Sequence, residues 1–167
     1  MANTTLMKFF EHNNWANFQL IEVCAALSDI QLDAEPDATT KGSIRLTLHH
    51  MMASQQSYWT QLAGVPPVFD WHSPPDFEAI REAAKITGEG LLALASDESG
   101  KLETTFHHDG YAIEPWVVML QAINHATEHR EQIKSLLSKL GLTPPRIDGW
   151  MYGRITHALV ELPDETP

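Results

Sequence analysis

Four stretches of the chain repeat apolar residues every three or four positions, which is the spacing of one face of an α-helix. They cover approximately residues 5–27, 43–62, 76–95 and 115–140. Glycine and proline gather between these stretches, where they interrupt regular structure. Four amphipathic helices of this length predict an all-α fold, a four-helix bundle, in a single domain that spans residues 1–167.

Residues suited to helix ends stand at several of the predicted boundaries. They are Ser43 and Asp76 as N-caps, Pro115 in the first turn of the fourth helix, and Gly141 after its last turn. The third helix has the weakest pattern, because Gly88 and Gly90 lie in its middle and glycine disfavours helix interiors.

Three shorter segments lie outside the predicted helices. Residues 102–113 alternate loosely around Asp109-Gly110, a dipeptide typical of two-residue hairpin turns, and therefore predict a short β-hairpin before the fourth helix. Residues 150–162 predict a short C-terminal helix that packs across the bundle. Residues 28–42 lack a helical pattern, and we expect an irregular loop there.

The composition is that of a globular protein with an acidic surface. Of the 167 residues, 43% are hydrophobic and 20% are charged, and 11 Lys and Arg against 22 Asp and Glu give a net charge of −11. This charge repels phosphate groups, which argues against nucleic acids and anionic membranes as partners. The sequence has no apolar run of about 20 residues, the length needed to span a membrane, and no pattern of a secretory signal peptide. The one cysteine, Cys24, is expected to be an inert core thiol, and these features together predict a cytoplasmic protein.

Nine histidines are many for this length, and their positions suggest a site. His125 and His129 are four residues apart on the flank of the apolar face of the fourth helix, within reach of one ion. In the second helix His50 lies on the flank of the apolar stripe, whereas His49 falls toward solvent. Considered alone, an HxxxH pair is better explained by two exposed histidines that fall at this spacing by chance, because nothing else in the pair marks a ligand.

A metal centre would form if the two histidine-bearing flanks converged in the bundle. Three neutral imidazoles hold a divalent ion and leave one position open to water or substrate, which is the pattern of catalytic sites. Imidazole nitrogen suits zinc, nickel, copper and iron, so the ligand type does not choose among them.

Several segments resemble the DinB family, also described as DinB/YfiT-like, in the order in which they occur along the chain. The most specific is Asn-His-Ala-Thr-Glu-His-Arg-Glu-Gln-Ile at 124–133. The others are Asn-Trp-Ala-Asn at 14–17, Ser-Ile-Arg-Leu-Thr-Leu-His-His at 43–50, Leu-Gly at 140–141 and Asp-Gly-Trp-Met-Tyr-Gly at 148–153. Together they span most of the sequence.

The resemblance implies a four-helix bundle, usually dimeric, that holds a metal through one histidine of the second helix and two of the fourth. Transferred position by position, these ligands fall on His50, His125 and His129. The implied cofactor is a divalent metal ion, with zinc or nickel favoured. Family members often carry a carboxylate about one and a half turns after the first histidine, where this chain has Gln55.

Two classes of function follow from the resemblance. The first is a metal-dependent enzyme that activates a thiol or water, of the thiol S-transferase or hydrolase type. Its substrate would be a small molecule, with a low-molecular-weight thiol as one candidate. The alternative is a non-catalytic, metal-binding, stress-related homodimer. A purely structural bundle with surface histidines would bind no metal.

Other polar and aromatic residues have more ordinary expected roles. Gln55 and Arg130 fall within apolar stripes, so each is expected to be buried and hydrogen-bonded, Arg130 with a carboxylate. Gln132 lies beside the histidine flank and is placed to orient a ligand imidazole or a bound water. The expected packing anchors are Trp15, Trp59, Trp116 and Trp150, and the expected dimer face of the first helix is Phe9, Phe10, Trp15 and Phe18. The remaining histidines, His12, His72, His107, His108 and His157, are expected on the surface.

Overall fold

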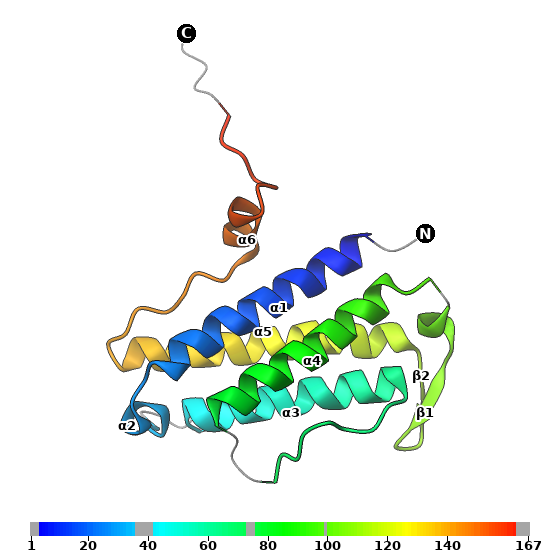
Figure 1. Ribbon diagram of the computed structural model, residues 1–167, viewed down its shortest axis with the longest axis horizontal. Coiled ribbons are helices and arrows are strands. Elements are labelled where there is room, and N and C mark those ends of the chain that lie inside the picture. The colour runs from blue at the N-terminus through cyan, green and yellow to red at the C-terminus, as the bar shows by residue number, and fades with distance from the viewer. Residues whose placement is uncertain (1–3, 36–41, 73–75, 99, 163–167) are drawn as a thin grey trace.

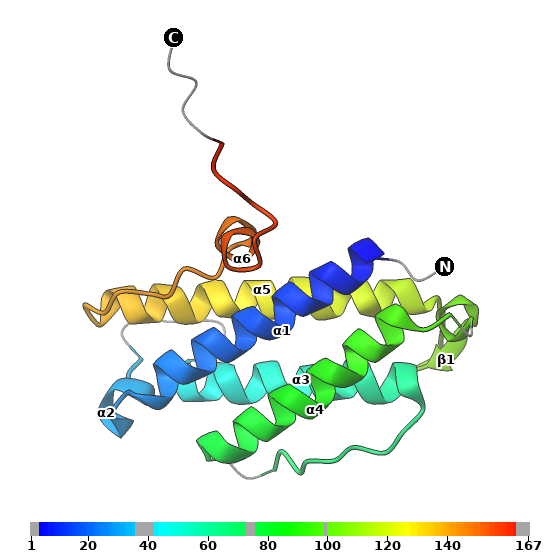
Figure 2. The same cartoon turned by 45° about the horizontal axis from the view of Figure 1, so that its top comes forward.

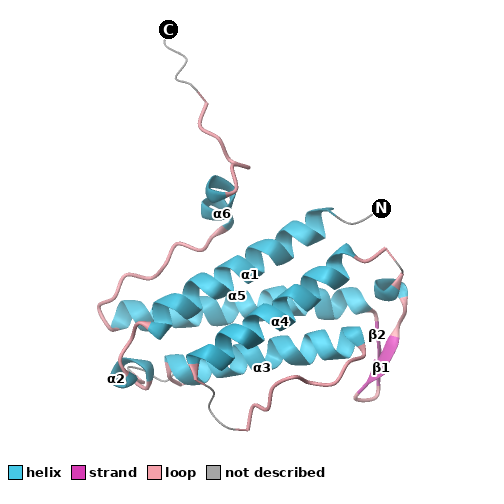
Figure 3. Ribbon diagram, viewed as in Figure 1, coloured by secondary structure: helices cyan, strands magenta, loops and turns pink. Residues whose placement is uncertain are grey.

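A computed structural model describes residues 4–35, 42–72, 76–98 and 100–162. The long helices are α1 (Thr4–Ala25), α3 (Ile44–Ala63), α4 (Phe77–Ser96) and α5 (Pro115–Lys139). The short elements are α2 (Asp29–Leu32), the 3₁₀ helix η1 (Lys101–Glu103), β1 (Phe106–His108), β2 (Tyr111–Ile113) and α6 (Gly149–Ile155). Helices dominate the fold, and strands occur only at one end of it in the described ranges (Figure 3).

The four long helices pack in a ring. Helix α1 contacts α4 and α5, and α3 contacts the same two helices from the other side. The β-hairpin lies at one end of the bundle, and α2 lies at the other (Figure 1). This arrangement confirms the predicted all-α bundle with a short hairpin before its last long helix.

Side chains at the helix ends explain where the helices begin and stop. The Ser43 hydroxyl accepts a hydrogen bond from the Leu46 N–H, and the Asp76 carboxylate accepts one from the Ala79 N–H, so both are N-caps as predicted. Helix α5 begins at Pro115 and ends before Gly141, whose φ of 74° is in the left-handed region.

The hairpin is confirmed with the predicted turn. Residues 106–108 pair antiparallel with residues 111–113, and His108 stands opposite Tyr111. The two turn residues, Asp109 and Gly110, have φ values of 49° and 82°. Two positive φ values in a two-residue loop are typical of a turn that matches the twist of the strands. The hairpin therefore brings Tyr111 to the end of the bundle where α5 begins.

The core consists of two hydrophobic clusters separated by a polar layer. One cluster is centred on Leu20, Leu48, Met52, Ile133 and Leu137, and the other on Phe10, Leu91, Val118, Met119 and Ala122. Between them along every long helix lie buried polar side chains, which are Asn13 and Asn17 of α1, Gln55 of α3, Thr87 of α4 and Arg130 of α5. Hydrogen bonds join these side chains to one another and offset much of the cost of burying them.

Helix α4 is continuous through its two central glycines because they allow close packing. A Cβ atom at Gly90 would lie 2.1 Å from the indole nitrogen of Trp59, and one at Gly88 would lie 2.7 Å from Asn14 Oδ1. The missing side chains therefore let α1 and α3 approach α4, which offsets the low helix propensity of glycine.

The segment after α5 differs in part from the prediction. Helix α6 ends at Ile155, buries none of its side chains and lies outside the ring of four helices (Figure 2). Its contact with the bundle is made by Tyr152, whose ring centroid is 5.3 Å from that of Trp15 and 5.4 Å from that of His12. The predicted short C-terminal helix is therefore confirmed, but it ends at Ile155 instead of Leu162 and does not pack across the bundle.

Other expectations about loops and aromatic residues also need correction. Residues 29–32 form a helical turn with a capping box between Ser28 and Gln31, where an irregular loop was predicted, whereas residues 36–41 of that loop lie outside the described residues. Trp116 and Trp150 are 58% and 72% exposed, so neither anchors the core. Phe10 is fully buried and therefore cannot contribute to a dimer face on α1.

Cys24 is buried in the core as predicted, and burial raises the pKa of its thiol to about 12. Only about one thiol in 10⁴ would be ionised at pH 8, and the thiolate is the reactive form. We therefore expect no labelling of the native protein by a disulfide reagent such as 5,5′-dithiobis(2-nitrobenzoic acid), but full labelling in denaturant. Rapid labelling without denaturant would contradict this packing.

The described helices include none with both the length and the apolar character needed to cross a bilayer.

Candidate metal centre

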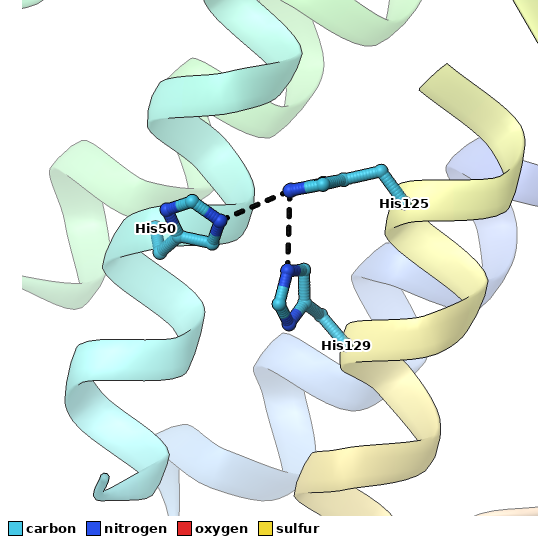
Figure 4. Close-up of side chains that lie close together, drawn as sticks. All are labelled: His50, His125 and His129. Carbon is cyan, nitrogen blue, oxygen red and sulfur yellow. Dashed lines mark hydrogen bonds between the residues drawn. The ribbon is translucent and has the colours of Figure 1, made fainter. Parts of the chain in front are cut away.

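The three histidines singled out by the sequence meet on one side of the polar layer, between α3 and α5. His50 projects from α3, and His125 and His129 project from successive turns of α5 (Figure 4). Their ligand atoms all lie within 4.8 Å of one another. Two helices that pack side by side thus bring together residues 75 positions apart in sequence.

The Nε2 atoms of the three rings converge on one point. His125 Nε2 lies 3.0 Å from His50 Nε2 and 3.1 Å from His129 Nε2. Nitrogens this close need a proton or a cation between them, because two lone pairs repel. A tetrahedral ion with bonds of about 2.0–2.1 Å sets its nitrogen ligands about 3.3 Å apart. The two separations about His125 are close to this value and all three ligand atoms lie within 4.8 Å of one another, so small movements of the rings would let them share one ion.

Gln132 fixes the orientation of one ring. The N–H on His129 Nδ1 donates to Gln132 Oε1 over 2.8 Å. A neutral imidazole with its proton on Nδ1 presents the lone pair of Nε2, and this nitrogen faces the other two rings. The structure thus confirms the expectation that Gln132 orients a histidine of the cluster.

The cluster is closed on one side and accessible on the other. His129 is 5% exposed, whereas His50 and His125 are half-buried. A buried imidazole with two partially accessible neighbours forms a shallow site rather than a sealed one. This is the accessibility that an ion with an exchangeable fourth ligand requires.

His49 is not part of the cluster, although it precedes His50 directly. Its Nε2 lies 2.8 Å from the carbonyl oxygen of Trp71, and the two rings pack edge to face. The side chain is half-buried under the segment that follows α3, so the prediction that it faces solvent is wrong. The choice of His50 over His49 for the cluster is nevertheless correct.

Arg130 holds α5 against α1 directly behind His129. One guanidinium nitrogen donates to Asn13 Oδ1 and to Asn17 Oδ1, both at 2.7 Å, and the other donates to Thr127 Oγ1. These partners are neutral, so the expected carboxylate partner is wrong. Burial lowers the pKa of Arg130 to about 10, which leaves the side chain charged at neutral pH.

Gln55 belongs to the same polar layer and not to the histidine cluster. Its carbonyl oxygen accepts from Asn17 Nδ2 at 2.9 Å, and its amide nitrogen donates to Thr87 Oγ1 at 2.8 Å. The expectation of a buried, hydrogen-bonded glutamine is confirmed. An amide does not titrate, so Gln55 supplies no acid or base to the cluster, and both ends of its side chain are engaged in the polar layer.

Tyr58 of α3 is a neighbour of the cluster that the sequence analysis did not single out. Its ring packs edge to face with that of His125, with centroids 5.7 Å apart. Burial, and to a lesser extent the charge of Glu128, raises the pKa of the Tyr58 hydroxyl. Its position two helical turns after His50 was the available signal, since residues eight apart share a helix face.

Other histidines in the described ranges have separate surroundings. His12 Nε2 lies 2.9 Å from the Ile147 carbonyl oxygen and packs with Trp15 and Tyr152, so this histidine is half-buried on α1 rather than fully on the surface. His72 pairs with Asp70 in an exposed loop. Within the part of the chain that the structure describes, His50, His125 and His129 form the one cluster of metal-ligating groups.

Comparison with known proteins agrees with this geometry. The model of the DinB family matches residues 1–165 of the chain. No curated protein matches the sequence.

Proposed function

The chain belongs to the DinB family, and we propose that it binds one divalent metal ion through the Nε2 atoms of His50, His125 and His129. The observation that carries this proposal is the convergence of these three atoms, with separations of 3.0 and 3.1 Å about His125. Three imidazole ligands suit zinc and nickel, which are the ions we favour.

We further propose that the centre is catalytic, as a thiol S-transferase or hydrolase acting on a small molecule. A divalent ion with three protein ligands, when bound, lowers the pKa of a thiol or water at its open position. The protein itself contributes the exclusion of bulk water on the His129 side and the fixed tautomer set by Gln132. The half-buried rings of His50 and His125 leave the approach for a substrate.

A non-catalytic metal-binding protein is the second candidate. It is favoured by Gln55, which stands where family members often carry a carboxylate and is fully occupied in the polar layer. A centre without a carboxylate at this position fits a structural or sensing role in a stress-related homodimer.

Metal analysis followed by an activity screen tests both candidates. Protein stripped with a chelator and reloaded should bind one equivalent of zinc or nickel per chain, measured by elemental analysis after gel filtration. No retained metal would overturn the metal centre. The loaded protein is then assayed with thiols plus electrophiles and with simple ester and amide substrates. Metal-dependent turnover supports the enzyme, and its absence across the panel supports the non-catalytic alternative.

Replacing Gln132 with leucine should weaken metal binding by about 10–100-fold without abolishing it. Loss of an outer hydrogen bond to a ligand imidazole typically has this effect, because the ring is then free to rotate and change tautomer. Competition with a chromophoric zinc chelator measures the change. Gln19→Leu, at an exposed position of α1, is the control for a surface glutamine and should leave the affinity unchanged.

A further inference from the structure

A pocket lies next to the histidine cluster, where the hairpin meets the ends of α3 and α5. Its volume is about 450 Å³, which is within the range of sites for small organic molecules. Aromatic and aliphatic side chains dominate the lining, and they include Tyr58, Tyr111, Ile113, Trp116, Val117 and Val118. Tyr111 and Trp116 are 71% and 58% exposed, so apolar surface is open to a ligand here.

The pocket borders the cluster through two side chains. Tyr58 lines the pocket on one side and packs against His125 on the other. Gln121 also lines the pocket and precedes His125 by one helical turn. A molecule bound in the pocket would therefore lie beside side chains that contact or neighbour His125.

The charges around the pocket exclude one class of ligand. None of the described residues that line it is a lysine or arginine. Its acidic member, Glu114, accepts a hydrogen bond from the Trp116 indole N–H, and the negative charge of Glu128 acts on Tyr58 at its inner wall. In the metal-free protein, carboxylates without a cation among the described lining residues repel anionic ligands and leave neutral ones unaffected.

We propose that this pocket binds the non-reacting part of the substrate, and that this part is an uncharged aromatic or other apolar group. The assignment of the pocket as a substrate subsite rests on the proposed function, since it requires the histidine cluster to be a reaction centre. The aromatic lining stacks on the apolar group, and the surrounding carboxylates select against acidic compounds. The substrate class is thus a neutral, hydrophobic small molecule.

Two dyes with the same aromatic skeleton test the binding part of the proposal. N-phenyl-1-naphthylamine is neutral, and 8-anilinonaphthalene-1-sulfonate differs from it by one sulfonate group. Fluorescence titration of the metal-free protein at low ionic strength should show at least tenfold tighter binding of the neutral dye, because two carboxylates at short range oppose the sulfonate. Equal affinity, tighter binding of the sulfonate or no binding would overturn the proposal.

Substitutions in the pocket, each paired with a control outside it, test whether the dye binds in this pocket. Trp116→Ala should weaken binding of the neutral dye about tenfold, whereas Trp150→Ala, which removes an exposed tryptophan of α6, should not. Gln121→Lys should bring the sulfonated dye to within about threefold of the neutral one. Gln19→Lys, at an exposed position of α1, should leave the preference unchanged. Dye binding unaffected by both pocket substitutions would overturn the assignment.

NMR signals of the histidine rings test whether a dye bound in the pocket lies close to the cluster. Titration with the neutral dye should shift the imidazole signals of His125 and leave those of His12 unmoved. Saturating dye binding without a shift at His125 would overturn the subsite while leaving metal binding intact. Conversely, a protein that binds no metal but shows the expected dye selectivity would overturn the proposed function and not the pocket, so the two failures are distinguishable.

Discussion

Replacing His50 with alanine is expected to lower the affinity for zinc or nickel by at least a hundredfold. The loss should exceed the 10–100-fold effect of an outer hydrogen bond, because it removes one of three direct ligands. It also removes the one ligand that α3 contributes, so the ion would no longer link α3 to α5. Chelator competition and elemental analysis after gel filtration measure the change.

The matched control for this experiment is the adjacent residue. His49→Ala removes a histidine of the same helix and breaks a hydrogen bond to the Trp71 carbonyl oxygen, but it leaves the cluster intact. This variant should retain one equivalent of metal. Equal retention by the two variants would show that His50 is not a ligand, and equal loss would point to a folding defect instead.

Thermal denaturation gives an independent measure of the same effect. A ligand at 100 times its dissociation constant stabilises the native state by about 2.7 kcal/mol. For a chain of this size, that corresponds to a rise in Tm of about 5–11 °C. The native protein and His49→Ala should both show this rise with added zinc, and His50→Ala should not. A zinc-dependent rise in all three proteins would indicate binding elsewhere.

Most of the fold could be predicted from the sequence, because local rules determine it. The caps at Ser43 and Asp76 and the turn at Asp109-Gly110 depend on side chains acting on their own backbone neighbourhood. The bundle follows from apolar stripes that must be covered by one another. Helical periodicity also selected His50 over His49 for the cluster, because it gives the side of the helix on which each residue lies.

Features that depend on distant partners could not be predicted in the same way. The helical periodicity of the sequence predicted that Arg130 is buried. It did not show that the hydrogen-bond acceptors of its guanidinium are the amide oxygens of Asn13 and Asn17. Likewise, the apolar residues after α5 correctly predicted a short helix. They could not show that this helix lies outside the bundle without burying its side chains. Tyr58 fits the apolar stripe of α3, and only the neighbouring helix shows that it touches His125.

Replacing Asn17 with leucine is expected to lower the free energy of unfolding by about 3–5 kcal/mol. Asn17 Oδ1 accepts from Arg130, and its amide nitrogen donates to Gln55. Leucine would leave a buried guanidinium with fewer acceptors and a buried carbonyl oxygen without its donor, and stranding a buried charge has a cost of this size. Chemical denaturation measures the loss, and thermal denaturation should show a fall in Tm of about 6–20 °C.

Arg130→Met should cost less than Asn17→Leu, about 1–3 kcal/mol, although it removes the larger side chain. Methionine eliminates the buried charge together with its desolvation penalty, and what remains are two neutral amide oxygens without a donor. Asn124→Leu, at an exposed position of α5, is the surface control and should change stability by less than about 0.5 kcal/mol. If Arg130→Met proved the more damaging of the two core variants, the guanidinium would be a net source of stability. The charge of Arg130 would then stabilise the polar layer, instead of being a cost that the layer only reduces.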